Sequence, residues 1–264
     1  MKPPYFETKL GQLFNDDCLN VINEMGPPDL VITSPPYNVG VNYDVHNDLM
    51  PAKDYFSWIE EVFRSLYNIM KDDSRLALNL PYEVNFKDIG DGRYFLLGEY
   101  WKILQHIGFK WAGMIDLKET SAHRPKLTSW GSWLSPSAPY VYNPKECVML
   151  LYKNNWKKET TGTSYFHKEN KNEFIKYVSG EWKYRAETKG LTEANFSLDI
   201  PLKALKLLSW QEDLVYDPFM GSGTTALACE MLGRRWTGSE ISKKYCKVAR
   251  DRLKKYVACD YFFE

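Results

Sequence analysis

The sequence predicts an α/β fold built around a mostly parallel central sheet. Short apolar runs such as residues 29–34 alternate with amphipathic segments of helical length, a pattern typical of sheets covered by helices on both faces. Residues 213–240 show a strand, a glycine-rich turn, a helix and a second strand in succession, which is a complete βαβ unit. Both observations favour a doubly covered sheet.

The individual elements follow in a regular order. Residues 9–25 predict a short strand, an acidic corner at Asp16 and Asp17, and a helical turn. The segments after them are assigned by apolar periodicity and by their glycine and proline boundaries: a strand over 29–34, a helix over 53–70, a strand over 75–80, a helix and a strand over 98–118, a strand over 146–153, a helix ending at 208, a strand over 213–217, a helix over 224–233 and a strand over 235–240.

Composition narrows the class of protein but gives little about its partners. The 264 residues are 44% hydrophobic and 26% charged, as in ordinary globular proteins. Lys and Arg equal Asp and Glu at 34 each, so the total charge indicates no polyanionic partner. The five cysteines are scattered, without a Cys-x-x-Cys pair, and no window approaches a membrane span. We therefore expect a cytoplasmic protein without a metal site or membrane contact.

A region with little periodicity lies in the second half of the chain. Residues 154–195 are polar and aromatic, and residues 143–190 hold ten Lys or Arg against six Asp or Glu. Such a region is either a solvated insertion or a nucleic-acid surface, because positive charge interleaved with stacking rings suits nucleic acid.

A second irregular stretch, residues 120–144, is rich in Ser, Pro, Trp and Tyr. Its aromatic residues either pack on the sheet edge or contact a nucleic acid.

The glycine-rich turn "DPFMGSGTT" at residues 217–225 predicts a cofactor site. Gly221 and Gly223 let the backbone approach a ligand, and the amides at the start of the next helix face it. Glu240 ends the following strand, where an acid can accept hydrogen bonds from both hydroxyls of a ribose. No lysine follows Gly223 as in a P-loop, and the third glycine of a dinucleotide site is absent. A nucleoside cofactor without phosphate, S-adenosylmethionine, is therefore the natural candidate.

The tetrapeptide Ser34-Pro35-Pro36-Tyr37 follows one strand, and the motif Asp-Pro-Phe-x-Gly-x-Gly at 217–223 follows another. The pair resembles the DNA amino-methyltransferases, and the order of the two motifs resembles the β class. The resemblance implies a Rossmann-like, circularly permuted methyltransferase fold with an inserted target-recognition region. It divides the chain into a catalytic half at 1–153, the insertion at 154–195 and a cofactor-binding half at 196–264.

The resemblance also implies residue roles. Asp17 stands in an Asp-Asp-Cys corner, with Asp16 in place of the usual glycine, and would contact the adenine of the cofactor. The full set expected to bind S-adenosylmethionine is Asp17, Asp217, Pro218, Phe219, Gly221, Ser222, Gly223, Thr224 and Glu240.

The expected catalytic residues are Ser34, Pro35, Pro36 and Tyr37. An exocyclic amine is a poor nucleophile because its lone pair is delocalised into the ring, and acceptors that hold its N–H groups stabilise the charge that develops. Ser34 Oγ and the Pro35 carbonyl would be these acceptors, the prolines would fix the carbonyl in advance, and Tyr37 would stack on a base turned out of the duplex. Methylation at carbon 5 of cytosine uses a cysteine nucleophile, which in the enzymes of that family follows a proline. None of the cysteines here follows a proline, so methylation at this carbon is disfavoured.

The target base stays open between N4 of cytosine and N6 of adenine. In the resembling family Ser at position 34 goes more often with cytosine, so we expect cytosine, with adenine as the alternative. A methyltransferase acting on RNA or protein, or a nucleic-acid-binding subunit without turnover, are further alternatives. Intact motifs disfavour the last.

Expected partners are DNA, a restriction endonuclease that acts on the same site without physical contact, and a second copy of the chain in a homodimer. Arg124, Lys126, Trp130 and Trp133 are the residues expected to bind nucleic acid.

Overall fold

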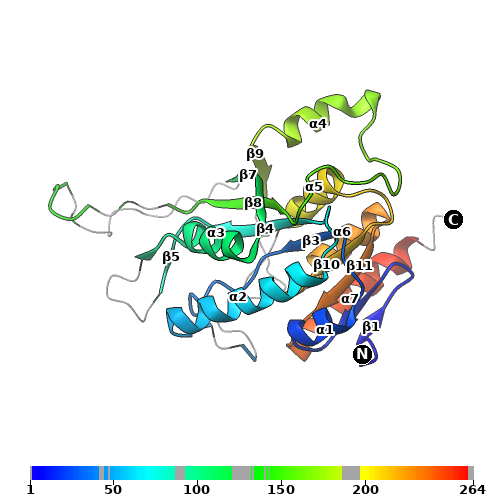
Figure 1. Cartoon of the computed structure of the whole chain (residues 1–264), viewed down its shortest axis with the longest axis horizontal. Coiled ribbons are helices and arrows are strands. Elements are labelled where there is room, and N and C mark those ends of the chain that lie inside the picture. Colours follow the sequence, from blue (N-terminus) through cyan, green and yellow to red (C-terminus); the bar gives the residue numbers. More distant parts are fainter. Residues whose placement is uncertain are drawn as a thin grey trace.

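A computed structural model of the chain shows one large sheet with helices on both faces (Figure 1). It describes residues 2–41, 45–46, 48–86, 93–120, 132, 134–139, 141, 143–185 and 197–260. The strands of this sheet are, in spatial order, β1 (Phe6–Glu7), β2 (Gly11–Phe14), β11 (Arg235–Ser239), β10 (Leu214–Asp217), β3 (Leu30–Thr33), β4 (Arg75–Pro81), β8 (Glu146–Tyr152), β7 (Lys110–Glu119) and β9 (Glu181–Tyr184).

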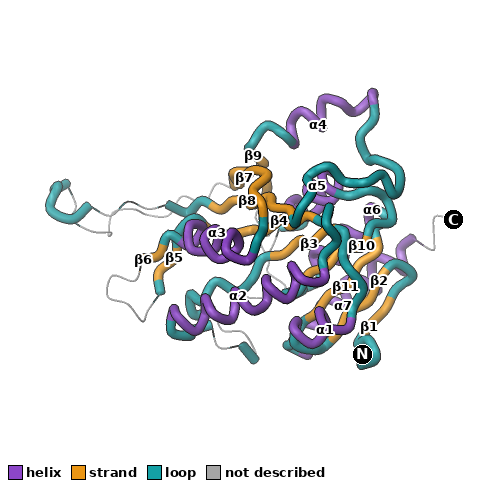
Figure 2. The backbone as a smooth tube through the Cα atoms, in the orientation of Figure 1, coloured by secondary structure: helices purple, strands orange, loops and turns teal. Residues whose placement is uncertain are grey.

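The helices and the remaining strands complete the described structure (Figure 2). The helices are α1 (Cys18–Glu24), α2 (Ala52–Ile69), α3 (Leu96–Ile107), α4 (Lys171–Tyr177), α5 (Asp199–Leu208), α6 (Thr224–Leu232) and α7 (Lys243–Asp260), with a 3₁₀ turn at Lys168–Asn170. A separate two-stranded ribbon pairs β5 (Val84–Asn85) with β6 (Arg93–Tyr94). No helix in the described ranges combines the length and apolar character of a membrane span.

The sheet is mostly parallel, as the sequence predicts. Strands β2, β11, β10, β3 and β4 run in one direction, and β7 and β9 share it. Strand β8 is antiparallel to both of its neighbours, and β1 is antiparallel to β2. Because β8 is reversed, its first residue lies at the same edge as the carboxyl ends of β3 and β4.

The order of strands confirms the permuted arrangement. Strands β10 and β11 come near the end of the chain, yet they lie in the sheet between β2 and β3. The glycine-rich turn after β10 is therefore the spatial neighbour of the tetrapeptide after β3. Two motifs about 180 residues apart in sequence meet at one edge, where open α/β sheets bind ligands.

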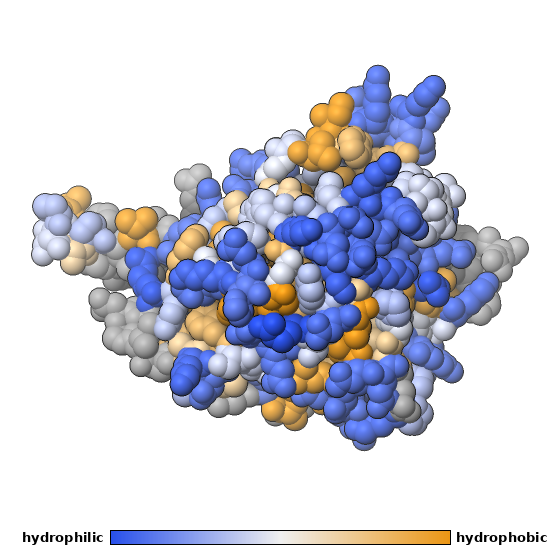
Figure 3. All heavy atoms as spheres, in the orientation of Figure 1, coloured by the Kyte–Doolittle hydropathy of each residue, from blue (hydrophilic) through white to orange (hydrophobic). Residues whose placement is uncertain are grey.

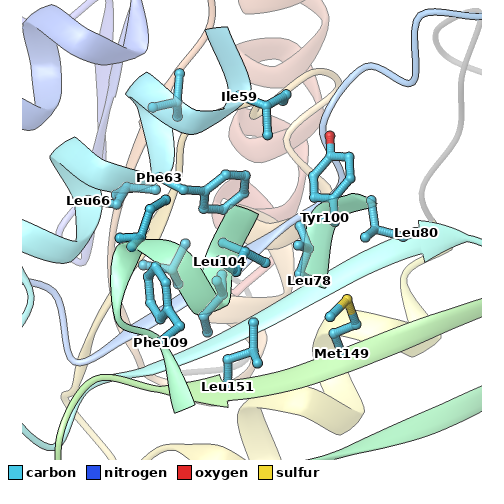
Figure 4. Packing of buried hydrophobic residues seen from close by; sticks show 14 of the residues in the cluster. Ile59, Phe63, Leu66, Leu78, Leu80, Tyr100, Leu104, Phe109, Met149 and Leu151 are labelled. Carbon is cyan, nitrogen blue, oxygen red and sulfur yellow. The ribbon is translucent and has the colours of Figure 1, made fainter. Parts of the chain in front are cut away.

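Two apolar cores lie on opposite faces of the sheet. Helices α1, α2 and α3 cover one face, and their side chains interdigitate with those of β4 and β8 (Figure 4). In that view Phe63 from α2 and Leu104 from α3 lie over Leu78 of β4. Helices α5, α6 and α7 cover the other face, and their core includes Leu205, Leu227 and other buried residues. The two-sided burial explains why the central strands are apolar without alternation.

An ionic cluster fixes the amino ends of β3 and β10. The Lys158 ammonium, 3% exposed, lies 3.2 Å from Asp29 Oδ1 and 3.7 Å from Asp213 Oδ2, and Lys71 Nζ lies 2.6 Å from Asp29 Oδ1. Burial alone would raise the pKa of Asp29, but hydrogen bonds from Lys71 and the Leu214 amide, together with the Lys158 charge, bring that pKa below its ordinary value. The cluster joins the strand that carries the tetrapeptide to the strand that carries the cofactor turn.

The described part of the predicted insertion, residues 154–185, contains α4 and β9. Strand β9 pairs with β7 and so continues the main sheet. Helix α4 projects from the body, and Figure 3 shows an apolar patch there beside hydrophilic side chains. Phe174, Ile175 and Val178 are exposed in this patch.

Candidate active site

The tetrapeptide Ser34–Tyr37 leaves the carboxyl end of β3 and is held from several sides. The Tyr55 hydroxyl donates to the Pro36 carbonyl oxygen over 2.9 Å, and it also bonds to the Tyr100 hydroxyl at 2.6 Å. Tyr55 and Tyr100 are fully buried. Two buried tyrosines therefore fix the peptide plane after the second proline, in addition to the restraint that both proline rings supply.

A short chain of hydrogen bonds orients the Ser34 hydroxyl. Its Oγ lies 2.6 Å from the Tyr37 hydroxyl, which donates to the backbone oxygen of Asn79 at 3.2 Å. Because the Tyr37 proton goes to Asn79, the proton between the two hydroxyls comes from Ser34. The Ser34 oxygen keeps its lone pairs for an incoming donor.

The loop after the tetrapeptide is organised by one carboxylate. Asp48 accepts four backbone N–H groups at 2.9 to 3.0 Å, those of Asn38, Val39, Gly40 and Val41. Asn38 has a positive φ of 59° and bonds in both directions with the backbone of Met50. This pairing joins Asn38 to Met50, two residues before α2 begins at Ala52.

Asp217 shapes the cofactor turn from inside. Its carboxylate accepts from Thr33 Oγ1 at 2.7 Å, Thr225 Oγ1 at 2.6 Å and the Phe219 amide at 3.0 Å. Full burial raises the pKa of Asp217 to about 6, although these hydrogen bonds act in the opposite direction. Asp217 thus joins β3, β10 and the start of α6.

The turn itself needs glycine at two positions. Gly221 and Gly223 have φ of 53° and 79°, in the left-handed region that favours glycine. A Cβ at Gly223 would also lie 2.9 Å from the Cβ of Ala249 on α7. The turn therefore leaves no room for a side chain at Gly223, the residue that caps the start of α6.

Two cavities open at this edge, and Ser34 lines both. The first, of about 240 Å³, has Asp17 and Glu240 among its lining residues, together with the rings of Trp58 and Phe219. The second, also about 240 Å³, is lined by Ser34, Tyr37, Asn79 and Glu146, and by residues of the glycine turn, Gly221, Ser222 and Thr224. Ser34 thus belongs both to a cavity with nucleoside-binding features and to a polar cavity beside it.

The first cavity fits S-adenosylmethionine by its donor set. Glu240 offers a carboxylate, and Asp17, the N-cap of α1, offers another beside it. Trp58 and Phe219, with ring centroids 5.5 Å apart, form an apolar aromatic wall that suits a purine or a sulfonium. No Lys or Arg lines this cavity among the described residues, in agreement with a cofactor that lacks phosphate.

The structure brings most of the sequence-predicted residues to one place. Those that line one or both cavities are Asp17, Ser34, Pro36, Tyr37, Asp217, Pro218, Phe219, Gly221, Ser222, Thr224 and Glu240. Pro35 is buried beside them, and Gly223 shapes the turn without lining a cavity.

Four predicted residues lie where the structure gives no description, and three residues of the cavities were not predicted. Arg124, Lys126, Trp130 and Trp133 lie outside the described residues, so their predicted contacts stay predictions. Sequence reasoning missed Trp58, Asn79 and Glu146, which line the cavities from within regular elements. Within the described ranges, no three His, Cys, Asp or Glu side chains form a group that could hold a metal.

Comparison with known proteins identifies the family. Residues 28–251 match the family N6_N4_Mtase, described as DNA methylase. The type II methyltransferase M.MjaVI of Methanocaldococcus jannaschii is 39% identical over 177 residues, which cover 67% of this chain and 87% of that protein. M.BamHI of Bacillus amyloliquefaciens is 26% identical over 271 residues, covering 95% of this chain and 59% of that protein.

Solved structures share the fold. A DNA modification methylase from Thermus thermophilus, in complex with S-adenosyl-L-methionine, aligns with a TM-score of 0.72 at 21% identity over 93% of this chain and 94% of its own. The PvuII DNA methyltransferase aligns with a TM-score of 0.70 at 19% identity, covering 94% and 88%. With the family match over most of its length, the chain belongs to the DNA amino-methyltransferases, the S-adenosylmethionine-dependent enzymes that methylate N4 of cytosine or N6 of adenine.

Proposed function

We propose that this enzyme methylates N4 of a cytosine that has rotated out of the DNA duplex, with Ser34 as the central catalytic residue. The observation that carries the proposal is that Ser34 lines both cavities. When bound, S-adenosylmethionine supplies an electrophilic methyl group in the first cavity. The base would enter the part of the second cavity that Ser34, Tyr37, Asn79 and Glu146 line, so its amine would lie between Ser34 and that methyl group.

The chain's own residues would prepare the amine for attack. Ser34 Oγ and the Pro35 carbonyl would accept its two N–H groups and stabilise the positive charge that develops on nitrogen. The Tyr55 bond to the Pro36 carbonyl and the Tyr37 bond to Asn79 hold these acceptors before the base arrives. Tyr37 would also present its ring to the base.

The cofactor-binding roles are proposed on the same geometric grounds. Glu240 would accept the ribose hydroxyls, and Asp17 would contact the adenine from the N-terminus of α1. Gly221, which lines both cavities, and the α6 amides beyond it would face the carboxylate of the methionine part, which would reach the glycine-turn end of the second cavity. Trp58 adds an aromatic wall to this set.

The preference for cytosine depends on Ser34. The PvuII methyltransferase, which has the same fold, is named as cytosine-N4-specific. Adenine also presents an amine beside a ring nitrogen, so N6-adenine is the alternative that the experiment below separates.

The remaining proposals concern DNA and partners. We propose that residues 154–195, with Arg124, Lys126, Trp130 and Trp133, recognise the DNA sequence, and that α4 contacts the duplex. Relatives named as type II methyltransferases support a restriction endonuclease that acts on the same site without binding this chain. We also propose that the enzyme forms a homodimer and works in the cytoplasm.

The decisive experiment analyses DNA treated with the enzyme and labelled S-adenosylmethionine. The DNA is digested to nucleosides and separated by mass spectrometry. We expect labelled N4-methylcytosine. Labelled N6-methyladenine would instead show that adenine, the alternative, is the target base. Ser34→Ala should lose methyl transfer while calorimetry still detects cofactor binding, and full activity of this variant would remove the assigned site.

A further inference from the structure

Glu146 is a carboxyl inside the second cavity that none of the roles above uses. It is the first residue of β8, and the reversed direction of β8 brings it to the carboxyl edge of the sheet, in register with Pro81 of β4. Glu146 lines this cavity together with Ser34 and Tyr37. Three adjacent strands, β3, β4 and β8, thus each bring one polar side chain to the place proposed for the base.

Asn79 holds the Glu146 carboxyl in place. Its Nδ2 donates to Glu146 Oε2 at 3.1 Å and to the Cys147 carbonyl at 3.1 Å. Both amide hydrogens of Asn79 are therefore engaged. The backbone oxygen of Asn79 receives the Tyr37 hydroxyl, so one residue connects Glu146 to the hydrogen-bond chain that orients Ser34. The relative position of Glu146 and Ser34 is thereby fixed before substrate arrives.

The surroundings of Glu146 make its carboxyl easier to protonate than a free one. Burial raises the pKa of Glu146, and the charge of Glu119 on β7 acts in the same direction, while the Asn79 hydrogen bond opposes them. None of the ion pairs among the described residues includes Glu146. A half-buried carboxyl whose pKa is raised keeps its proton to a higher pH than a free one, and in its protonated form it offers an O–H donor.

We propose that the Glu146 carboxyl donates a hydrogen bond to the ring nitrogen beside the target amine, N3 in cytosine, and thereby selects and positions the base. The proposal rests on the base site proposed above. Ser34 would accept from the amine while Glu146 donates to the adjacent ring acceptor, and this donor–acceptor pair occurs on cytosine and adenine. Thymine and guanine present the reverse pattern, a carbonyl beside a ring N–H, and would leave both protein groups unpaired.

The test removes each partner of this hydrogen bond in turn. After the methylated position has been mapped, oligonucleotides carry either cytosine or 3-deazacytosine there, since the latter replaces the N3 acceptor with C–H. For the wild-type enzyme, kcat/KM should be roughly tenfold lower on the 3-deazacytosine substrate than on the cytosine substrate. This decrease should exceed any decrease that the same change of substrate causes in a variant without the donor. In Glu146→Ala the values of kcat/KM for the two substrates should agree within about twofold. Full discrimination in Glu146→Ala would overturn the proposal.

Two further variants keep the test decisive. Glu146→Gln retains an amide donor and should keep the discrimination, whereas Glu146→Met fills the volume without a donor and serves where the alanine variant does not fold. Glu61→Ala, on the exposed side of α2, is the matched control and should behave as wild type. Loss of discrimination in Glu146→Gln with intact folding would also contradict the proposal.

The outcome separates this inference from the proposed function. If nucleoside analysis finds N6-methyladenine, the cytosine proposal fails, and the same cycle is run with 1-deazaadenine, in which the acceptor beside the amine is absent. Calorimetry gives the affinity for S-adenosylmethionine in each variant. Unchanged cofactor affinity supports a base-binding role, and a loss of cofactor affinity in Glu146→Ala as large as its loss of kcat/KM would assign Glu146 to the cofactor instead.

Discussion

Glu240 accepts a hydrogen bond from the backbone N–H of Gly221, with 2.9 Å between the Gly221 nitrogen and Oε2. Its other oxygen, Oε1, accepts from the Ser242 amide at 2.8 Å. The acid at the end of β11 therefore braces the glycine turn after β10, and both features of the sequence motif form one rigid unit. Glu240 also lines the first cavity.

We expect Glu240→Ala to weaken S-adenosylmethionine binding by roughly ten- to a hundredfold, because it removes charge-assisted hydrogen bonds to the ribose and releases the turn. Isothermal calorimetry measures this directly. Glu61→Ala serves as the control for loss of one carboxylate. Equal affinities for the wild type and Glu240→Ala would remove Glu240 from the cofactor site.

Tyr37→Phe should lower kcat roughly tenfold while the cofactor affinity stays the same. The phenyl ring can still stack on a base, but the Ser34 proton loses its acceptor and the Asn79 carbonyl loses its donor. Single-turnover methylation, combined with calorimetry for the cofactor, separates the two effects. Tyr67→Phe, which packs against Phe109 away from the site, is the matched control. A normal rate in Tyr37→Phe would show that stacking alone matters.

Asp48→Ala should lower the free energy of unfolding by about 2 kcal/mol or more, because four backbone N–H groups lose their carboxylate. The loop it holds includes Val45, His46 and Met50, which line the first cavity. We therefore expect a higher KM for S-adenosylmethionine as well. Urea unfolding and steady-state kinetics test the two parts, and an unchanged midpoint of unfolding would show that the loop does not depend on Asp48.

Asp217 should make stability depend on pH in a defined window. Burial raises its pKa to about 6 in the folded protein, whereas the ordinary value is 3.8. Between these values the unfolded chain has lost the proton and the folded chain keeps it. The free energy of unfolding should therefore fall by about 3 kcal/mol between about pH 3 and about pH 7 on account of this group, and the contribution should stay constant above about pH 7.

Asp217→Asn isolates that contribution, since asparagine does not titrate. Urea unfolding at pH 4.5 and pH 7 should show that the stability of the variant relative to wild type rises with pH. If the free energies of unfolding of the two proteins changed equally with pH, the pKa of Asp217 would not be raised.

The central strands and the cofactor unit could be predicted from sequence because their signals are local. The apolar run at 29–34 became β3, and the run at 213–217 became β10. Gly221, Gly223 and Glu240 could be found because a turn of this kind requires glycine and a ribose requires an acceptor at a fixed spacing. These requirements act on residues that are close in the chain.

Other site residues carry no local signal. Trp58 lies within an amphipathic helix, and Asn79 lies within an apolar strand, where neither looks functional from the sequence. Glu146 reaches the site only because β8 runs antiparallel to β4, and strand direction depends on the whole fold. In residues 154–185, β9 is short and polar, and pairing with β7 rather than intrinsic propensity makes it a strand.

The position of β10 and β11 between β2 and β3 has a consequence for biosynthesis. While the ribosome makes the chain, β2 and β3 emerge early, yet the strands that must lie between them appear some 180 residues later. Until then the facing edges of β2 and β3 have unpaired backbone groups, which favours intermolecular pairing and slows folding. Nascent chains that end before Leu214 should therefore need chaperones, and methyl transfer cannot begin on a partly made enzyme.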